Sequence, residues 1–270
     1  MRRLLIRPGA IGDVILSLPA LEAARAEYTE VWTPRVMLPL IRFADRTRAI
    51  PDTGLDLVGV VDHARSRAVM RAMDELAGFD SIYSWYGTNR PEFREAVADL
   101  PFEFFPALPP PAQGVPKIDA PLDPAAPERL VVLHPFASSP SKRWPLEKFR
   151  QVAAAIADDG WDVRWCAGPL REFDRETLPS ELEADAVRKA DLYDLACWLS
   201  AARLYIGNDS GIAHLAAAVG IPVIAIFLRS DPVIWAPRGP RVRVLVRPDV
   251  NDVVDAVKML FPQDAGGFLQ

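Results

Sequence analysis

Short apolar runs alternate with longer amphipathic stretches from the first residues of the chain to about residue 260. The apolar runs predict strands at Leu4–Arg7, Val31–Thr33, Leu57–Val61, Ser81–Trp85, Leu130–His134, Asp162–Ala167, Leu204–Gly207, Pro222–Phe227 and Val242–Val246. The amphipathic stretches predict helices at Asp13–Glu27, Arg35–Asp45, Leu146–Asp158, Asp191–Ala202, Gly211–Val219 and near Asn251–Leu260. Strands that alternate with helices are typical of βα units around a parallel sheet, so the pattern predicts an α/β fold.

A proline-rich segment divides this pattern into two halves. Eight of the 26 prolines lie between Pro106 and Pro127, and such a stretch favours an extended, semi-rigid spacer. We expect a first domain at residues 1–105, a linker at 106–127, a second domain at 128–262 and a loose tail at 263–270. Ligands of open parallel sheets bind at the carboxyl ends of the strands, so function is expected in a cleft between the two domains.

Charge and cysteine content narrow the classes of function. The 31 basic and 36 acidic residues leave a formal charge of −5, which offers no basic surplus to follow a nucleic-acid backbone. Of the basic residues, 26 are arginine, the side chain suited to bidentate contact with phosphate or carboxylate. The composition is therefore compatible with binding of small anionic partners. Cys166 and Cys197 form neither a close-spaced metal pair nor a disulfide framework, which favours a reducing compartment.

No segment of the sequence is long and apolar enough to predict a membrane span. The longest apolar run, residues 215–228, has 14 residues and contains Pro222, whereas a spanning helix needs about 20. Arg7 and Pro8 interrupt the apolar start of the chain too early for a signal peptide. We expect a cytoplasmic protein with, at most, peripheral contact at the inner face of the cytoplasmic membrane.

The first segment with candidate chemistry, Arg7–Asp13, joins the first predicted strand to the first predicted helix. Gly9 and Gly12 permit backbone angles and close approaches that other residues forbid, and the next amides point out of a helix N-terminus. The glycine spacing matches neither a dinucleotide fingerprint nor a P-loop. Asp13 has two interpretations: a carboxylate that stabilises the helix start, or a general base at the mouth of the cleft.

The second segment, His134–Pro145, is a polar loop after the first strand of the second domain. It holds Lys142 and Arg143 beside three serines, a combination that suits a phosphate group. The alternative is a solvated loop in which Trp144 packs the following helix onto the sheet. The local sequence leaves both interpretations open.

The third segment, Tyr205–Phe227, carries the most specific pattern. A strand ends at Gly207, the chain turns, and a helix of small residues follows. Ser210 is a good N-cap, and Gly211 lets a ligand approach the amides of the first helical turn. His214 stands four residues after Ser210 on the same helix face, so we favour a binding role for it over a packing role.

Together these motifs resemble glycosyltransferase family 9, the bacterial ADP-heptose:lipopolysaccharide heptosyltransferases. The motifs are Gly12–Val14 with Pro19–Leu21 near the N-terminus, Lys142–Pro145 at mid-chain, and Asp209–Pro222. Their order and spacing cover most of the chain. The resemblance implies the GT-B architecture, in which two Rossmann-like parallel-sheet domains face each other across a cleft.

The resemblance also implies roles for single residues. Asp13 would be the general base that deprotonates the acceptor hydroxyl. The implied donor-binding residues are Lys142 at the phosphates, Asp209, Ser210, Gly211 and His214 at the pyrophosphate and neighbouring ribose or sugar, and Glu172 at the nucleoside. The family inverts the anomeric centre in one displacement and needs no coordinated metal. The sequence holds no Asp-x-Asp triplet for Mg²⁺, so amides, Lys142 and His214 would stabilise the leaving-group charge.

The expected function is therefore transfer of a sugar, heptose from ADP-heptose, to a lipopolysaccharide core or other glycan, with no cofactor. Two departures from the family pattern support an alternative, a GT-B-like protein that binds a nucleotide sugar without turning it over. Phe136 stands where relatives often have glycine, and Phe227–Ser230 replaces a Phe-Gly-Pro-Thr turn and places Arg229 there. A nicotinamide-dependent epimerase or reductase lacks its glycine fingerprint here.

Arginines of the first domain offer cations for an anionic glycolipid acceptor. Acidic neighbours such as Asp45 and Asp62 favour a solvated surface instead, and the sequence leaves the two interpretations open. The arginines concerned are Arg35, Arg42, Arg46, Arg48, Arg65, Arg67 and Arg71.

Overall fold

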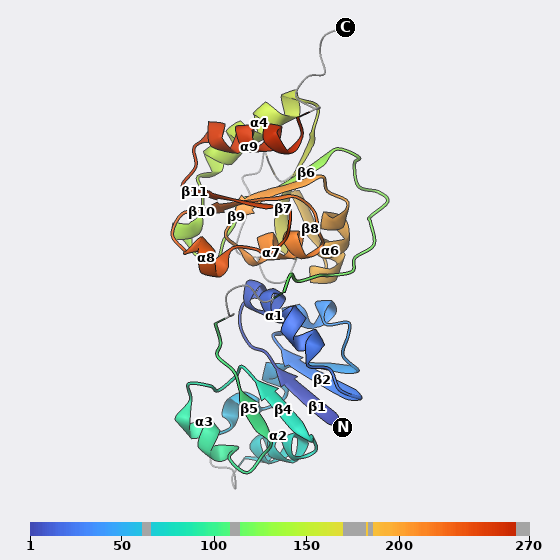
Figure 1. Cartoon of the computed structure of the whole chain (residues 1–270), viewed down its shortest axis with the longest axis vertical. Coiled ribbons are helices and arrows are strands. Elements are labelled where there is room, and N and C mark those ends of the chain that lie inside the picture. Colours follow the sequence, from blue (N-terminus) through green and yellow to red (C-terminus); the bar gives the residue numbers. More distant parts are fainter. Residues whose placement is uncertain (61–65, 109–113, 170–181, 183–185, 263–270) are drawn as a thin grey trace. The chain divides into compact units, whose positions relative to one another are not determined.

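The computed structural model describes residues 1–60, 66–108, 114–169, 182 and 186–262 of the chain. These residues form two compact units, unit 1 at Met1–Gly114 and unit 2 at Val115–Gln270 (Figure 1). The division falls inside the proline-rich segment. Each unit contains one sheet in which all paired strands are parallel, so the predicted α/β class is confirmed.

The sheet of unit 1 has five strands in the order β3-β2-β1-β4-β5. Its strands are β1 (Arg2–Ile6), β2 (Tyr28–Thr33), β3 (Arg46–Ala49), β4 (Ser81–Ser84) and β5 (Phe102–Phe104). The α-helices are α1 (Ile11–Ala23), α2 (Arg67–Ala77) and α3 (Pro91–Ala96), and the short 3₁₀ helices are η1 (Arg35–Leu40), η2 (Ile50–Asp52) and η3 (Leu55–Leu57). The chain leaves β1 toward β2 on one side and later returns to β4 on the other, so the strand order reverses at β1.

Two elements predicted for unit 1 are wrong. The predicted helix Arg35–Asp45 is the short 3₁₀ helix η1, which contains Pro39, and strand β3 follows it. Proline removes a backbone donor and clashes with the preceding turn, so an α-helix cannot run through this position without a kink. The predicted strand Leu57–Val61 begins inside η3, where Gly54 enters the turn with φ 74° and Gly59 follows with φ 77°. Val61 lies outside the described residues.

The sheet of unit 2 has six strands in the order β11-β10-β9-β6-β7-β8. Its strands are β6 (Leu130–His134), β7 (Asp162–Pro169), β8 (Ala186–Lys189), β9 (Leu204–Asn208), β10 (Val223–Phe227) and β11 (Val242–Val246). Its helices are η5 (Pro140–Lys142), α4 (Leu146–Asp158), α6 (Leu192–Ser200), α7 (Gly211–Ala218), α8 (Pro232–Trp235) and α9 (Val250–Leu260). In sequence order this sheet runs 3-2-1-4-5-6, the arrangement of a dinucleotide-type Rossmann sheet, with β6 and β9 at the reversal.

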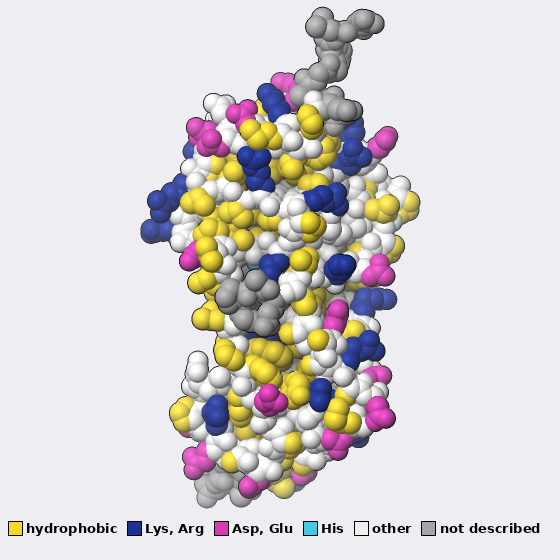
Figure 2. Space-filling view, viewed as in Figure 1, with side chains coloured by type: hydrophobic (Ala, Val, Ile, Leu, Met, Phe, Trp, Pro, Cys, Tyr) yellow, Lys and Arg dark blue, Asp and Glu magenta, His cyan; other side chains and the backbone are white. Residues whose placement is uncertain are grey.

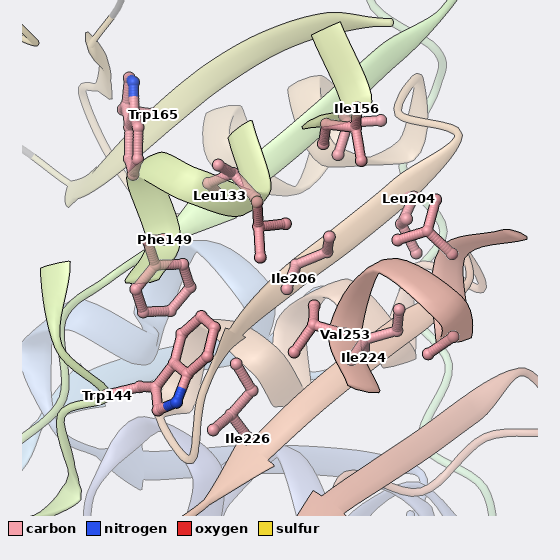
Figure 3. Close-up of a cluster of buried hydrophobic side chains, with 14 of the residues drawn as sticks. Leu133, Trp144, Phe149, Ile156, Trp165, Leu204, Ile206, Ile224, Ile226 and Val253 are labelled. Carbon is pink, nitrogen blue, oxygen red and sulfur yellow. The ribbon is translucent and has the colours of Figure 1, made fainter. Parts of the chain in front are cut away.

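The core of unit 2 fixes the segments at the carboxyl ends of β6 and β9. Helices α4 and α9 cover one face of the sheet, and α6 and α7 cover the other (Figure 1). Trp144 is buried against Phe149, with ring centroids 5.0 Å apart, and its indole donates to the carbonyl of Pro248 at 3.1 Å (Figure 3). The packing interpretation of Trp144 is therefore correct, and this side chain anchors the loop that precedes α4.

The later part of the proline-rich segment, after the division at residue 114, is attached to unit 2. The amide of Ile118 donates to the carbonyl of Ala218 at 3.0 Å, and the Ser200 hydroxyl donates to the carbonyl of Pro121 at 3.1 Å. Lys189 lies 3.4 Å from Asp123. Among the helices of the described residues, none has both the length and the apolar character of a membrane span.

Candidate functional site

The topology of unit 2 brings the second and third candidate segments together. The loop after β6 carries Lys142, and the turn after β9 carries Asp209, Ser210 and Gly211. Strands β6 and β9 are hydrogen-bonded neighbours, with His134 opposite Gly207. The two segments therefore leave the same edge of the sheet at the point where strand order reverses, which is where such sheets bind ligands.

Asp209 and Lys142 form an ion pair at this edge. Lys142 Nζ lies 2.7 Å from Asp209 Oδ2, with the carboxylate buried and the lysine side chain partly exposed. The hydroxyl of Ser230 donates to the same oxygen, and the amide of Asp209 donates to the carbonyl of Ile226. Lys142 is thus held in place by a buried carboxylate.

Asn208 holds the two segments in register. Its carbonyl oxygen accepts from the amide of Trp144 at 2.9 Å, and its side-chain amide donates to the carbonyl of Pro135 at 2.6 Å. Sequence reasoning missed this residue. The sequence shows only an amide side chain directly after an apolar run; its full burial, which requires hydrogen-bond partners, is seen in the structure.

The start of α7 offers amides to a ligand. Ser210 is the N-cap, and its hydroxyl accepts from the amide of Ala213 at 3.4 Å, so the predicted cap is confirmed. Gly211 is the first helical residue. Unpaired amides and the helix dipole make such a terminus favourable for negative charge.

Gly207 is required at the end of β9. A Cβ at this position would stand 2.5 Å from the hydroxyl oxygen of Tyr205. The Tyr205 side chain is fully buried, and burial raises the pKa of its phenol well above the usual 10. Because Gly207 has no side chain, the Tyr205 ring can pack against the backbone just before the turn that carries Asp209 and Ser210.

His214 lies next to the ion pair and is neutral at physiological pH. Its side chain is 5% exposed, and burial lowers its pKa from 6.5 to about 4, with Arg238 and Lys142 adding to the decrease. Asp209 and a hydrogen bond to the backbone of Trp235 oppose the shift. Nδ1 is buried without a hydrogen-bond partner in the described part of the chain. The ring is therefore a hydrogen-bonding group and not a cation.

In unit 1, Asp13 stands at the third position of α1, after β1. Its Oδ2 accepts from the amide of Ala10 at 2.8 Å, which satisfies one donor at the helix start. Gly9 has φ 118°, and a Cβ there would stand 2.8 Å from Cβ of Asp13. Asp13 is partly exposed, and Gly12 lies beside it in the first turn. The geometry thus gives Asp13 a capping contact while the residue stays partly exposed.

The remaining candidate residues take other positions. Glu172 lies outside the described residues. Phe136 is buried and contacts the ring of His134 edge-on, with centroids 5.7 Å apart. Arg229 is exposed in the turn after β10, and Ser230 in the same turn is the partner of Asp209. Within the described residues, no group of three His, Cys, Asp or Glu side chains is placed to hold a metal ion.

Comparison with known proteins identifies the class of fold and then the family. The structure matches that of E. coli ADP-heptose lipopolysaccharide heptosyltransferase II with a TM-score of 0.69 over 98% of this chain and 100% of the other, at 18% identity. This similarity establishes the GT-B fold. Residues 96–258 match the model of glycosyltransferase family 9 (heptosyltransferase). The chain therefore belongs to glycosyltransferase family 9.

Curated relatives share parts of the sequence. Lipopolysaccharide heptosyltransferase 1 of Pseudomonas aeruginosa is 36% identical over 112 residues, which are 41% of this chain and 31% of the relative. Lipopolysaccharide heptosyltransferase 3 of E. coli K12 is 30% identical over 168 residues, which are 51% of this chain and 48% of the relative. The chain thus spans less than half the length of each of these relatives.

Proposed function

We propose that the protein is an inverting glycosyltransferase that moves heptose from ADP-heptose to a lipopolysaccharide core or other glycan acceptor. The observation that carries the proposal is the cluster of Lys142, Asp209 and His214 around the N-terminus of α7, at the strand reversal of unit 2. Membership of family 9 supports the reaction class, and the named activities of the relatives support the sugar. The donor is the only small molecule required, with no metal or other cofactor.

The donor diphosphate is assigned to the α7 terminus. Its negative oxygens accept from amides around Gly211 and from Lys142, whose ammonium group is already held at the site by Asp209. Ser210 caps the helix and keeps these amides oriented. Preorganised donors of this kind stabilise charge that develops on the leaving diphosphate.

His214 contacts the neutral part of the donor. A buried imidazole with a pKa near 4 carries no charge at pH 7, so it does not attract phosphate as a cation. The bond to the Trp235 backbone uses Nε2–H, because Nδ1 has no partner among the described residues. Nδ1 is then an acceptor, and a ribose or sugar hydroxyl is the complementary group.

Asp13 is assigned as the general base. The acceptor hydroxyl oxygen attacks the anomeric carbon while the bond from that carbon to the diphosphate oxygen breaks. The hydroxyl proton passes to the Asp13 carboxylate, and the nucleotide leaves as ADP. Transfer requires the accessible oxygen of Asp13 to reach the acceptor hydroxyl, which is why a partly exposed carboxylate suits this role.

The acceptor surface is assigned to the arginines of unit 1. Several already have acidic partners: Arg35 pairs with Asp52 and Arg48 with Glu75, while Arg46 lies 3.8 Å from Glu30. In Figure 2 basic and acidic side chains are interspersed over the face in view. Arg67 and Arg71, together with Met70 and Asp74, line an open hollow of about 440 Å³ on α2, and these two arginines are the candidates that we assign to an anionic glycolipid. Arg65 lies outside the described residues. Action at the inner face of the cytoplasmic membrane, through peripheral contact, follows from such an acceptor.

Calorimetric titration with ADP tests the donor site. We expect Lys142→Ala and His214→Ala to weaken ADP binding, the lysine by about 10- to 100-fold for a lost charged hydrogen bond. Lys258→Ala, which removes an exposed lysine from the last turn of α9, is the matched control and should bind as the wild type does. Wild-type affinity in both site variants would refute the site.

Transfer from ADP-heptose, measured as ADP release with a lipopolysaccharide-core acceptor, tests the activity. We expect ADP release to increase when the acceptor is added. Tight ADP binding without release would favour the alternative, a nucleotide-sugar-binding protein, which the changed turn Phe227–Ser230 motivates.

A further inference from the structure

Arg7 is a buried guanidinium at the carboxyl end of β1 that the transfer step does not use. Its side chain is 2% exposed. Its backbone is fixed to β2, because the Arg7 amide donates to Trp32 and the Thr33 hydroxyl donates to the Arg7 carbonyl. Arginines are rarely fully buried unless their charge is paired or hydrogen-bonded, because removing a charge from water is costly.

The guanidinium binds four neutral acceptors. Nε donates to the Ser17 hydroxyl at 2.7 Å, and Nη1 donates to the Pro8 carbonyl at 2.9 Å. Nη2 donates to the carbonyls of Asp13 at 3.1 Å and Ala107 at 3.2 Å. The planar fork thus reaches the turn before α1, the first turn of α1, and the start of the proline-rich segment.

These contacts fix Asp13 from its backbone side. The Asp13 carbonyl accepts from Arg7 and from the Ser17 hydroxyl, which lies 2.8 Å away. Its carboxylate accepts from the Ala10 amide, and the turn that carries this amide is bound to Arg7 through the Pro8 carbonyl. The backbone carbonyl and the side-chain carboxylate of Asp13 therefore both depend on the position of the Arg7 guanidinium.

We propose that Arg7 is a positioning residue for Asp13, holding the turn and the first helical residues so that the carboxylate faces the acceptor hydroxyl. The inference rests on the proposed function, in which Asp13 is the base. Lysine keeps the charge at this position but has no planar fork, so it cannot satisfy four acceptors that lie around a guanidinium. Misplacement of a reacting group by about 1 Å costs on the order of 100-fold in rate.

The test compares Arg7→Lys with Arg3→Lys. Arg3 is a matched control because it lies in β1, which Arg7 directly follows, and donates to Ser81 and the Ala24 carbonyl, away from Asp13. We expect Arg7→Lys to lower kcat by about 10- to 100-fold with the donor KM within twofold, because the donor site lies in unit 2. Arg3→Lys should transfer at the wild-type rate. Wild-type kcat in Arg7→Lys would overturn the proposal.

A double-mutant cycle separates action through Asp13 from any independent role. If Arg7 acts through Asp13, adding Arg7→Lys to Asp13→Asn should lower transfer no further than Asp13→Asn alone. A further loss in the double variant would overturn the proposal. Exchange of the Ala10 amide, measured by NMR, needs no activity: it should accelerate in Arg7→Lys and not in Arg3→Lys. Absence of transfer by the wild type would refute the proposed function, whereas unchanged Ala10 exchange would refute the role of Arg7.

Discussion

The turns after β1 and after β9 occupy equivalent places in their sheets, but different side chains satisfy the N-termini of the helices that follow them. Each joins a central strand to a helix at a strand reversal, and each places an aspartate there. After β9, the Ser210 hydroxyl caps α7, so the carboxylate of Asp209 is available to bind Lys142 and Ser230. After β1, no hydroxyl caps α1, and Asp13 itself accepts from the Ala10 amide.

In unit 2 the cap and the proposed donor-site carboxylate are separate residues, whereas in unit 1 Asp13 makes the capping contact and is also the proposed base. Removing the cap of α7 leaves the Asp209 carboxylate in place, whereas removing the Asp13 carboxylate removes both the capping contact and the proposed base. Asparagine distinguishes the two functions of Asp13, because it accepts the Ala10 hydrogen bond without carrying a base.

Asp13→Asn should have the largest effect on transfer. We expect the transfer rate to fall by about 10²- to 10⁴-fold, because an amide cannot accept the acceptor proton. The melting temperature and ADP affinity should stay near the wild-type values, because asparagine retains the capping contact and the proposed donor site consists of residues of unit 2. Transfer at the wild-type rate would refute the base, and joint loss of stability and ADP binding would make Asp13 structural.

Acid should destabilise unit 2 through its buried histidines. Burial lowers the pKa of both His134 and His214 from 6.5 to about 4, so between these values the unfolded chain binds protons that the folded chain does not. Stability is therefore complete above pH 6.5 and falls as pH decreases toward 4. The loss is at most about 3 kcal/mol per imidazole.

Urea unfolding of the wild type and His214→Gln between pH 7 and pH 4 checks this expectation. Glutamine does not titrate, so the variant should lose less stability over this range, with the remaining slope shared by His134 and the carboxylates. The difference between the two proteins isolates His214. Parallel pH dependences would mean that His214 titrates normally in the folded protein.

The sequence was more informative for unit 2 than for unit 1. The predicted bounds of Leu130–His134, Leu146–Asp158 and Val242–Val246 are confirmed, because these elements have continuous apolar runs or a clear helical period. In unit 1, Arg35–Asp45 resembles a helix by composition, but the chain forms only a short 3₁₀ helix that contains Pro39, and strand β3 follows. Proline disfavours an α-helix at this position. It does not exclude one by itself, because α1 contains Pro19.

The residue types of the candidate site could be predicted from the sequence, but the contacts between these residues could not. Ser210 was recognised as a cap because its partners are local in sequence. The pairing of Lys142 with Asp209 depends on the adjacency of β6 and β9, which no local pattern contains. Asn208 and Arg7 were missed for the same reason: each is recognisable only from burial and from acceptors distant along the chain. The roles of the site residues in transfer stay predictions.

Ser210→Ala should lower stability without releasing Lys142. Loss of an N-cap hydroxyl costs about 1 kcal/mol, and Ser210 is the only side-chain acceptor for the first turn of α7 within the described residues. Thermal unfolding measures the loss. Ser210→Gly, which caps helices better than alanine, should recover part of it. An unchanged melting temperature in Ser210→Ala would show that the 3.4 Å contact with Ala213 contributes nothing.

Asp209→Asn should have the smallest effect, and its sign is the informative part. The Asp209 carboxylate forms an ion pair with Lys142, so in the proposed donor site it would compete with the diphosphate for this cation and repel the diphosphate directly. Asparagine keeps a hydrogen-bond acceptor for Ser230 and removes the charge. ADP binding should therefore tighten by about two- to fivefold, in the range of a partly exposed ion pair.

Asp231→Asn is the control: it removes a nearby exposed carboxylate that caps α8, and it should leave ADP affinity unchanged. Calorimetric titration of both variants decides the matter, because weaker ADP binding in Asp209→Asn would mean that the carboxylate positions Lys142 for the phosphates and does not compete with them.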